Sequence, residues 1–531
     1  MGFLTRTQAV GVAALALGIS VFLSRILGLV RDKVISYYFG AGDEADVYFT
    51  SFVVPDFLNY LLAGGYFSLT LVPLLSLVFR RDEEDGWRFF SGAVFWATLA
   101  IAVLTLAAWL AVPCLVPLVA PGFSPENQDR LALFLRIILP AQVFFLPGAC
   151  FSAMLYTRRQ FAVPALTPLI YNMCIIAGGL LMFFSAPHRG MEGFCWGVLA
   201  GAFLGALLLP CLAVRAGGLR FFLPRRRVLL HPDMKALVLL ALPLMLGQSV
   251  VVLDEQFIRV FGSLTGEGGV SLLNYARRVM LVPVGVVAQA AGLASYPFLA
   301  ALAAEKNSQA FDASLNKALS ATVLVALPLS LWMVSIAHPL MRLIFQQGLL
   351  TPAEAELSGN LLAMMLIGVT FWAIQQIVGR AFYAHKDTLT PALAGTAATI
   401  LALPFYYLGA VRLGPTGVAL AGTLAVTFYT GILCLLWTKR FGPRGLAHIP
   451  AAAARSFVLC LPACVAAYGL TLLLPLPESS LWEALASVCG GGVAFAAVYL
   501  GLSHLLAPEV SDPLLRFGAD LARRLRSGKR R

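Results

Sequence analysis

Charged residues are scarce in this sequence. Asp, Glu, Lys and Arg make up only 12% of the 531 residues, whereas soluble globular proteins usually carry about 25%. The hydrophobic classes make up 60% of the chain, and its mean hydropathy is +0.84. No soluble fold could bury that much apolar surface. The deficit of charge therefore excludes an ordinary soluble domain and indicates that the bilayer surrounds most of the chain.

The sequence also lacks the motifs of the common enzyme classes. It has no Walker loop, GxSxG elbow, HExxH pair or zinc-ligand spacing, and its six histidines are scattered. The nine cysteines form no CxxC pair and lie mostly in apolar segments, which is typical of small packing residues. These absences favour a non-enzymatic protein without a metal or cofactor.

Long apolar stretches recur from Val10 to Leu506. Each has the length of about 20 residues that crosses a roughly 30 Å hydrocarbon core. Backbone groups in lipid must be hydrogen-bonded internally, and these stretches are longer than barrel strands, so the predicted fold is all-helical. In the second stretch, Pro55 and the pair Gly64 and Gly65 predict bends. We expect about fourteen transmembrane helices, centred near Ala14, Leu62, Leu104, Phe144, Ile176, Gly201, Leu246, Val286, Val325, Leu366, Ile400, Thr427, Val465 and Ala494.

Basic residues are concentrated in alternate breaks between the apolar stretches, and the intervening breaks are mostly neutral or acidic. By the positive-inside rule the basic breaks are cytoplasmic. Both termini are therefore expected in the cytoplasm, which agrees with an even number of crossings. The net charge of +12 therefore reflects the membrane topology, because the basic residues lie in the cytoplasmic breaks. It does not indicate a nucleic-acid partner, and none is expected.

A segment of the first half recurs in the second half. Tyr156 to Leu166 and Tyr383 to Leu393 share one tyrosine-to-proline spacing around a basic turn, and the same offset relates Pro125 to Pro352. Two matches at one offset indicate an internal duplication. Each copy holds an even number of helices, so both keep the same orientation, a common plan among transporters. The predicted parts are a six-helix lobe at 1–227, a second at 228–452, and two further helices with a basic cytoplasmic tail at 453–531.

Several charges fall inside the predicted helices. A charge at the bilayer centre costs about 2.5 to 3.5 kcal/mol, so each needs a partner or a water-filled cavity. Arg25 and Asp32 lie nearly two turns apart on one face of the first helix, and Gly28 between them would permit close helix approach. Arg31 and Asp32 could instead extend to the outer interface, an escape that is harder for the deeper Arg25.

The seventh and eighth helices carry further charges. Asp254 and Arg259 could form a structural ion pair or serve an ion, and Arg277 and Arg278 lie one helix further on. Arginines that converge on a cavity between the lobes would suit a phosphate or pyrophosphate, because a guanidinium binds such oxygens bidentately. Asp46, at the outer end of the second helix, could equally be a helix N-terminal charge.

A series of motifs resembles the MurJ/MviN lipid II flippases, in the order of that family and over essentially the whole chain. Its first part is SRILGLVRD at Ser24–Asp32. The others are Phe39–Gly42, Asp46–Phe49, Pro55, Phe67–Ser68, Val72–Pro73, Ala120–Phe123, Asn274–Arg278, Phe345–Gly348, Phe382–Asp387 and Thr390–Pro391.

The resemblance implies the fold of the multidrug/oligosaccharidyl-lipid/polysaccharide exporters. It implies outward movement of lipid II, the undecaprenyl-pyrophosphate-linked peptidoglycan precursor, by alternating access in the bacterial inner membrane. The protein would act as a monomer among membrane lipids, with a role in cell-wall synthesis and cell shape. In the family, the arginines matching Arg25, Arg31 and Arg278 line the cavity and are thought to hold the pyrophosphate, and the last two helices form a groove for the lipid tail. The substrate-binding residues expected here are Arg25, Arg31, Asp46, Asn59, Arg277 and Arg278.

The chain departs from the family pattern at several cavity positions. Some relatives build a sodium site from an acidic residue on the seventh helix and from Asn or Asp on the eleventh. Asp254 matches the first of these residues, but residues 388–411 of the eleventh helix contain no Asn or Asp. The residues therefore do not favour a sodium site of this kind, and coupling to the membrane potential or to a monovalent cation is expected. Family members commonly carry an arginine pair where this chain has Asn59 and Tyr60, and a glutamate where it has Gly64. They commonly carry an aspartate where it has Arg277 and an acidic residue where it has Leu281.

These departures keep other functions open. One is a flippase for another polyprenyl-linked glycan. Another is an ion-coupled drug antiporter of the same superfamily, although such proteins usually have twelve helices. A scaffold for envelope synthesis would share the topology but leave the buried arginines unexplained.

Overall fold

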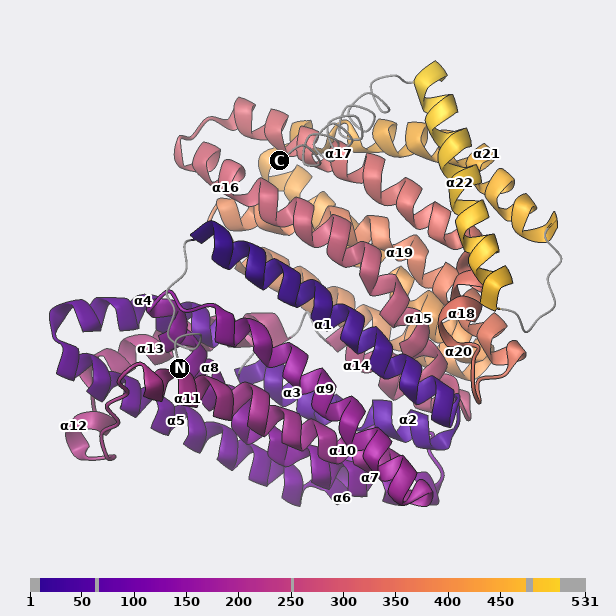
Figure 1. Cartoon of the computed structure of the whole chain (residues 1–531). Helices are drawn as coiled ribbons and strands as arrows, with labels where there is room; N and C mark the ends of the chain where they lie inside the picture. The colour runs from indigo at the N-terminus through magenta and orange to yellow at the C-terminus, as the bar shows by residue number, and fades with distance from the viewer. Residues whose placement is uncertain (1–9, 63–65, 250–252, 474–480, 507–531) are drawn as a thin grey trace, which may run out of the picture. The chain divides into compact units, whose positions relative to one another are not determined.

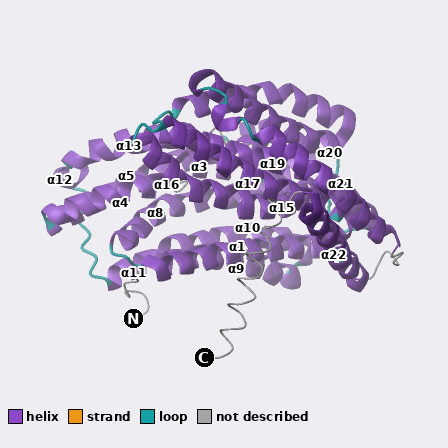
Figure 2. Cartoon of the chain, turned by 90° about the horizontal axis from the view of Figure 1, so that it is seen from above, coloured by secondary structure: helices purple, strands orange, loops and turns teal. Residues whose placement is uncertain are grey.

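The structure, a computed structural model, describes residues 10–62, 66–249, 253–473 and 481–506. Every regular element in these ranges is helical (Figure 2). Nine of the described helical segments are long and apolar enough to cross a membrane. The all-helical, multi-pass membrane fold is thus confirmed, and the count of fourteen helices stays a prediction.

The chain forms two compact units. The first contains residues up to 274 together with Ala410–Pro415, and the second contains residues 275–409 and those from 416 onward. The predicted parts at 1–227, 228–452 and 453–531 rest on the sequence repeat rather than on compactness, and they stay predictions.

The first unit is built from α1 to α14 (Figure 1), and α15 (Gly269–Pro283) runs from it into the second unit. A π-helix at Ala202–Leu208 joins α10 to α11. The helices are α1 (Val10–Phe39), α2 (Asp43–Thr50), α3 (Val53–Leu62), α4 (Tyr66–Arg81), α5 (Glu83–Leu110), α6 (Val112–Val119), α7 (Pro125–Ile138), α8 (Gln142–Thr157), α9 (Ala162–Ser185), α10 (Gly190–Gly201), α11 (Leu209–Ala216), α12 (Arg226–Leu229), α13 (Pro232–Ser249) and α14 (Leu253–Gly262).

The second unit continues with longer helices. In α20 the backbone of Gly414 is non-helical, with φ 61°. Glycine adopts this left-handed conformation without strain, so the helices predicted around Ile400 and Thr427 meet at this kink. The helices are α16 (Ala290–Ala304), α17 (Ser308–Ser335), α18 (Ala337–Phe345), α19 (Pro352–Ala384), α20 (Leu389–Phe441), α21 (Ile449–Leu473) and α22 (Leu481–Leu506).

The second predicted helix is interrupted, as its proline indicated. Helix α2 ends at Thr50 and α3 begins at Val53, with a turn at Ser51 and Phe52. Pro55 has no backbone N–H to donate to the carbonyl of Ser51, so the helical ladder is weakened here. The other predicted bend, at Gly64 and Gly65, lies outside the described residues.

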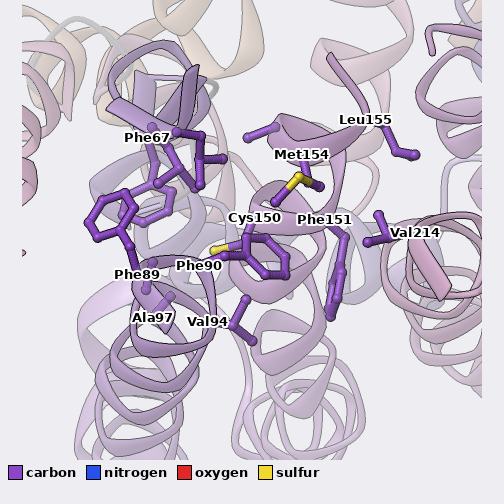
Figure 3. Close-up of a cluster of buried hydrophobic side chains, with 14 of the residues drawn as sticks. Phe67, Phe89, Phe90, Val94, Ala97, Cys150, Phe151, Met154, Leu155 and Val214 are labelled. Carbon is purple, nitrogen blue, oxygen red and sulfur yellow. The ribbon is translucent and has the colours of Figure 1, made fainter. Parts of the chain in front are cut away.

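An aromatic and aliphatic cluster forms a core of the first unit between α5 and α8 (Figure 3). Phe89 and Phe90 come from α5, and the fully buried Cys150 and Met154 come from α8. Cys150 therefore acts as a small apolar packing residue.

Helices α9 and α10 pack with their backbones in close contact. A Cβ atom at Gly197 would lie 2.6 Å from the carbonyl oxygen of Cys174, and one at Gly178 would lie 2.6 Å from that of Gly193. Only glycine fits such separations. At Gly28, where close approach was predicted, no atom of the described residues lies within 4 Å of the Cβ position. The expected approach at Gly28 is therefore not found in the described chain.

Equivalent local structures occur at both copies of the sequence repeat. Ser124 and Thr351 cap the N-termini of α7 and α19, and each hydroxyl accepts a backbone N–H three residues later at 3.3 Å. Arg159 and Lys386, in the two basic turns, have positive φ angles of 58° and 61°. Such angles are uncommon for residues other than glycine. The repeat in sequence thus corresponds to a repeat in backbone structure.

Candidate functional site

Two adjacent charges of α1 form a buried ion pair. Nε and Nη2 of Arg31 donate to Oδ1 of Asp32 at 2.9 and 2.8 Å. The side chain of Asp32 is 1% exposed and that of Arg31 is 11% exposed. The predicted alternative, in which both side chains extend to the interface, is therefore wrong. Arg25 lies two turns earlier on α1 and is exposed in the structure.

Arg259 of α14 holds two carboxylates from two helices. Its Nη1 lies 2.7 Å from Oδ2 of Asp56 on α3, and its Nη2 lies 3.1 Å from Oε1 of Glu255. The side-chain oxygen of Gln256 also accepts from Nη1, at 3.2 Å. The sequence identified Arg259 but paired it with Asp254, whose side chain lies outside the described residues. Glu255, four residues before Arg259 on one helix face, was the available signal.

Asp46 of α2 caps a helix that is distant in sequence. Its Oδ1 accepts the backbone N–H of Ser271, in the first turn of α15, at 2.7 Å, and the residue is 1% exposed. The first N–H groups of a helix have no intrahelical partner and carry partial positive charge, so a buried carboxylate is stabilised there. This geometry favours the second of the two predicted roles, a helix N-terminal charge.

Arg130 of α7 joins three helices through a second ion network. It contacts Glu44 of α2 at 2.7 Å and Glu192 of α10 at 2.5 Å, and its guanidinium lies 4.8 Å from the ring centroid of Phe134. No local pattern indicates this network, because its members come from three breaks between apolar stretches. Because Glu44 and Glu192 lie near the ends of their helices, the network has a structural role in joining these helices.

Two further predicted arginines lie on α15 in the second unit. Arg277 is 7% exposed, and its guanidinium lies 5.8 Å from the ring centroid of Trp372 on α19, a cation–π distance. Arg278 and, in the first unit, Asn59 of α3 are half-buried. The convergence of Arg277 and Arg278 with Arg25 on one cavity stays a prediction.

The motif that ends at Asp387 forms a turn between α19 and α20. The carboxylate accepts the N–H and hydroxyl of Thr390 at 3.0 and 2.7 Å and pairs with Arg440. Partial burial alone would raise the pKa of Asp387, but the hydrogen bonds from Thr390 and the charge of Arg440 outweigh it and hold the pKa below its usual value. This landmark is therefore structural.

Comparison with known proteins identifies the family. A family model described as lipid II flippase MurJ matches residues 35–482. The chain belongs to the MurJ family. A probable lipid II flippase MurJ of Rhizobium meliloti (strain 1021) is 28% identical, over 90% of this chain and 91% of its own. A lipid II flippase MurJ of Burkholderia cenocepacia is also 28% identical, over 79% and 82%. Flippases are transporters, so the members of the MurJ family are transport proteins and not enzymes.

Solved structures show the same fold. A lipid II flippase MurJ in an inward closed conformation has a TM-score of 0.75 at 23% identity, covering 93% of this chain and 99% of that one. An inward-facing multidrug resistance MATE family transporter has a TM-score of 0.65 at 14% identity, covering 83% and 98%. The expected exporter superfamily fold is therefore confirmed for this MurJ family member.

Proposed function

We propose that this chain moves lipid II from the inner to the outer leaflet of the bacterial cytoplasmic membrane by alternating access. The observation that carries the proposal is the match to the MurJ family over residues 35–482. Under this proposal the protein acts as a monomer without a cofactor, and both termini are cytoplasmic. Its partners are lipid II and the surrounding membrane lipids.

Arginines are the groups suited to the pyrophosphate of such a substrate. Arg25 is exposed on α1, and a guanidinium can make bidentate contacts with phosphate oxygens. The buried Asp32 orients Arg31 through two hydrogen bonds. In this proposal Arg25 and Arg278 contact the pyrophosphate, and Asp32 is a positioning residue for Arg31.

The membrane potential favours outward movement of such an anion. A potential of 100 mV is worth about 2.3 kcal/mol for each elementary charge that crosses. A pyrophosphate that moves from the negative cytoplasmic side to the outer side gains this free energy, and no nucleotide is required.

The last two helices are proposed to receive the polyprenyl tail. Helices α21 and α22 pack against each other around an apolar cluster that includes Cys460, Ala463 and Phe495. Other large apolar side chains on these helices, such as Val465 and Val493, are exposed, as expected for helices that face lipid chains.

The test is flipping of labelled lipid II by the purified chain in liposomes. Arg25→Ala removes a charge-assisted contact worth about 1.5 to 3 kcal/mol, so substrate affinity is expected to fall roughly 10- to 150-fold. Arg25→Lys should restore only part, because a point charge lacks the bidentate fork. Arg225→Ala, in the loop before α12, serves as the control for loss of one positive charge. No flipping by the wild type, or full activity of Arg25→Ala, would contradict the proposal.

A further inference from the structure

An apolar groove runs along the surface of the first unit between α9 and α10, which lie side by side (Figure 1). Its volume is about 430 Å³, within the range of about 300 to 1,000 Å³ that is usual for small-molecule sites. Gly178, Gly193 and Gly197 line it where the two backbones are in contact. Leu181 and Trp196 also line it and are 72% and 50% exposed. The absence of side chains at the glycines therefore leaves a hollow between larger apolar side chains.

The groove is about as long as one leaflet of a membrane is thick. On α9 its lining extends from Cys174 to Ser185, which corresponds to about 16 Å at a helical rise of 1.5 Å per residue. Half of a hydrocarbon core of roughly 30 Å is about the same length. Both helices belong to segments that are long and apolar enough to cross a membrane. The groove therefore matches the depth of a single layer of lipid chains.

The chemistry of the lining suits a hydrocarbon. No charged side chain lines the groove in the part of the chain that the structure describes. The hydroxyl of Ser185, at one end, donates to the backbone oxygen of Leu181 at 2.8 Å, so its hydrogen is already in use. A sugar, an ion or a peptide backbone would find few polar partners here, whereas a saturated chain needs only close apolar contact.

The width of the groove excludes a helix of another protein as the occupant. A volume of 430 Å³ spread over about 16 Å gives a mean cross-section of roughly 27 Å². An α-helix with its side chains is about 10 to 12 Å across, so it could not enter. One extended hydrocarbon chain is narrow enough.

A basic group follows directly at one end of the groove. Ser185 is succeeded by the turn Pro187–Arg189, which joins α9 to α10, and both His188 and Arg189 are exposed. The nearest acid in sequence, Glu192, is held by Arg130 at 2.5 Å. The described residues provide no ion-pair partner for Arg189. Its guanidinium is thus suited to the oxygens of a phosphate.

We propose that the groove between α9 and α10 binds one acyl chain of a phospholipid, with the phosphate of that lipid at Arg189. The alternation of basic breaks predicts that the turn at 187–189 lies outside, so the lipid belongs to the outer leaflet. The chain fills the hollow left by the glycines and supplies the contact atoms that they lack. This site does not depend on the proposed function, and it is separate from the tail-binding role proposed for α21 and α22.

Photolabelling tests the site directly. The purified full-length chain is placed in liposomes that contain phosphatidylglycerol with a diazirine in one acyl chain, and labelled peptides are identified by mass spectrometry after illumination. We expect the label to be concentrated in residues 174–185 and 193–200, above the level on the lipid-facing side of α5. Label spread evenly over the exposed helices would indicate ordinary lipid contact only. That result, or a groove left unlabelled because a second copy of the chain covers it, would overturn the proposal.

Variants that fill the groove provide the matched comparison. Ala177 and Ala200 line it from the two helices and are exposed, so Ala177→Leu and Ala200→Leu should each reduce labelling of the groove several-fold. Two variants on different helices keep the test valid if one of them fails to fold. Ala107→Leu, at an exposed position of α5, adds the same side chain outside the groove and should leave labelling unchanged. Undiminished labelling in both groove variants, or an equal loss in Ala107→Leu, would refute the site.

The contact with the headgroup has its own test. Arg189→Ala should lower labelling by phosphatidylglycerol by up to about fivefold, the size expected for an exposed charge contact, and Arg189→Lys should restore most of it. A diacylglycerol with the same photoactive chain has no phosphate, so its labelling should be the same in Arg189→Ala and in the wild type. Equal labelling of these two proteins by phosphatidylglycerol, or an equal loss with diacylglycerol, would contradict a phosphate at Arg189.

Discussion

Arg31 and Asp32 form a deeply buried ion pair on α1. A carboxylate that is 1% exposed is tolerated only while its partner is present, because an orphaned buried charge loses its hydration without compensation. The two residues are also adjacent in sequence, so a single turn of α1 positions both the guanidinium and the carboxylate. Its effects on stability and on substrate binding can therefore be separated by mutation.

Arg31→Ala should lower the free energy of unfolding by about 3 to 5 kcal/mol, because it leaves the carboxylate of Asp32 buried without this partner. The double variant Arg31→Ala/Asp32→Ala should recover much of that loss. Thermal unfolding of the purified variants in detergent measures both. A double variant no more stable than Arg31→Ala would contradict this account of the pair.

The cap supplied by Asp46 predicts a smaller effect. Asp46→Ala should destabilise the first unit by about 1 to 2 kcal/mol, because the N–H of Ser271 loses its acceptor. Asp46→Asn keeps an oxygen acceptor and should retain most of the stability. Comparing the unfolding temperatures of the two variants is the measurement, and equal losses would indicate that charge, not the hydrogen bond, matters.

At the scale of helices, local patterns predicted much of the structure. The apolar stretches gave the helical class, Pro55 gave the interruption between α2 and α3, and the duplicated motifs gave the equivalent turns at Arg159 and Lys386. Each of these depends on residues close together in the chain. Local sequence therefore suffices to predict these helices and turns.

The pairing of side chains could not be predicted in the same way. Asp56 and Arg259 meet across about two hundred residues of sequence, and Arg130 joins acids from two other helices. Such contacts depend on how distant helices pack, and no local period encodes that. The sequence consequently identified Arg259 and Asp46 as notable residues but not the groups they contact.

The close contact between α9 and α10 predicts a clear effect of one methyl group. A Cβ at Gly197 would lie 2.6 Å from a backbone oxygen that has little freedom to move. Gly197→Ala should therefore destabilise the protein by about 1 to 3 kcal/mol through overpacking. Unfolding temperature in detergent is the measurement.

Gly469→Ala on α21 is the matched control, because no atom of the described residues lies within 4 Å of its Cβ position. Alanine has the higher helix propensity, so this variant should be neutral or slightly more stable. If both variants lose stability equally, the difference in packing is not the cause.

At the scale of the whole chain, charge is redistributed relative to the family resemblance. The second helix has Asn59 and Tyr60 where relatives commonly carry an arginine pair, yet it holds Asp56 three residues earlier in an ion pair with Arg259. The first unit thus keeps a charged group on this helix, but one that is paired within the protein. If the chain moved a substrate other than lipid II, the loss of the arginine pair at Asn59 and Tyr60 would be the simplest structural reason.

The alternation of basic breaks makes a prediction about topology. A reporter fused after Arg531 should be cytoplasmic, and one inserted near Pro125 should be periplasmic. Paired reporters that are active on opposite sides of the membrane provide the measurement. Both reporters on the same side would refute the even number of crossings and the parallel orientation of the repeats.

The most direct test of the central claim is complementation of a bacterium depleted of its own lipid II flippase, with exposure of lipid II on the outer leaflet as the readout. The account predicts that this chain restores exposure and growth, and that Arg25→Ala, expressed at the same abundance, does not. Cells that contain the wild-type chain in the membrane at normal abundance but expose no lipid II would contradict the account.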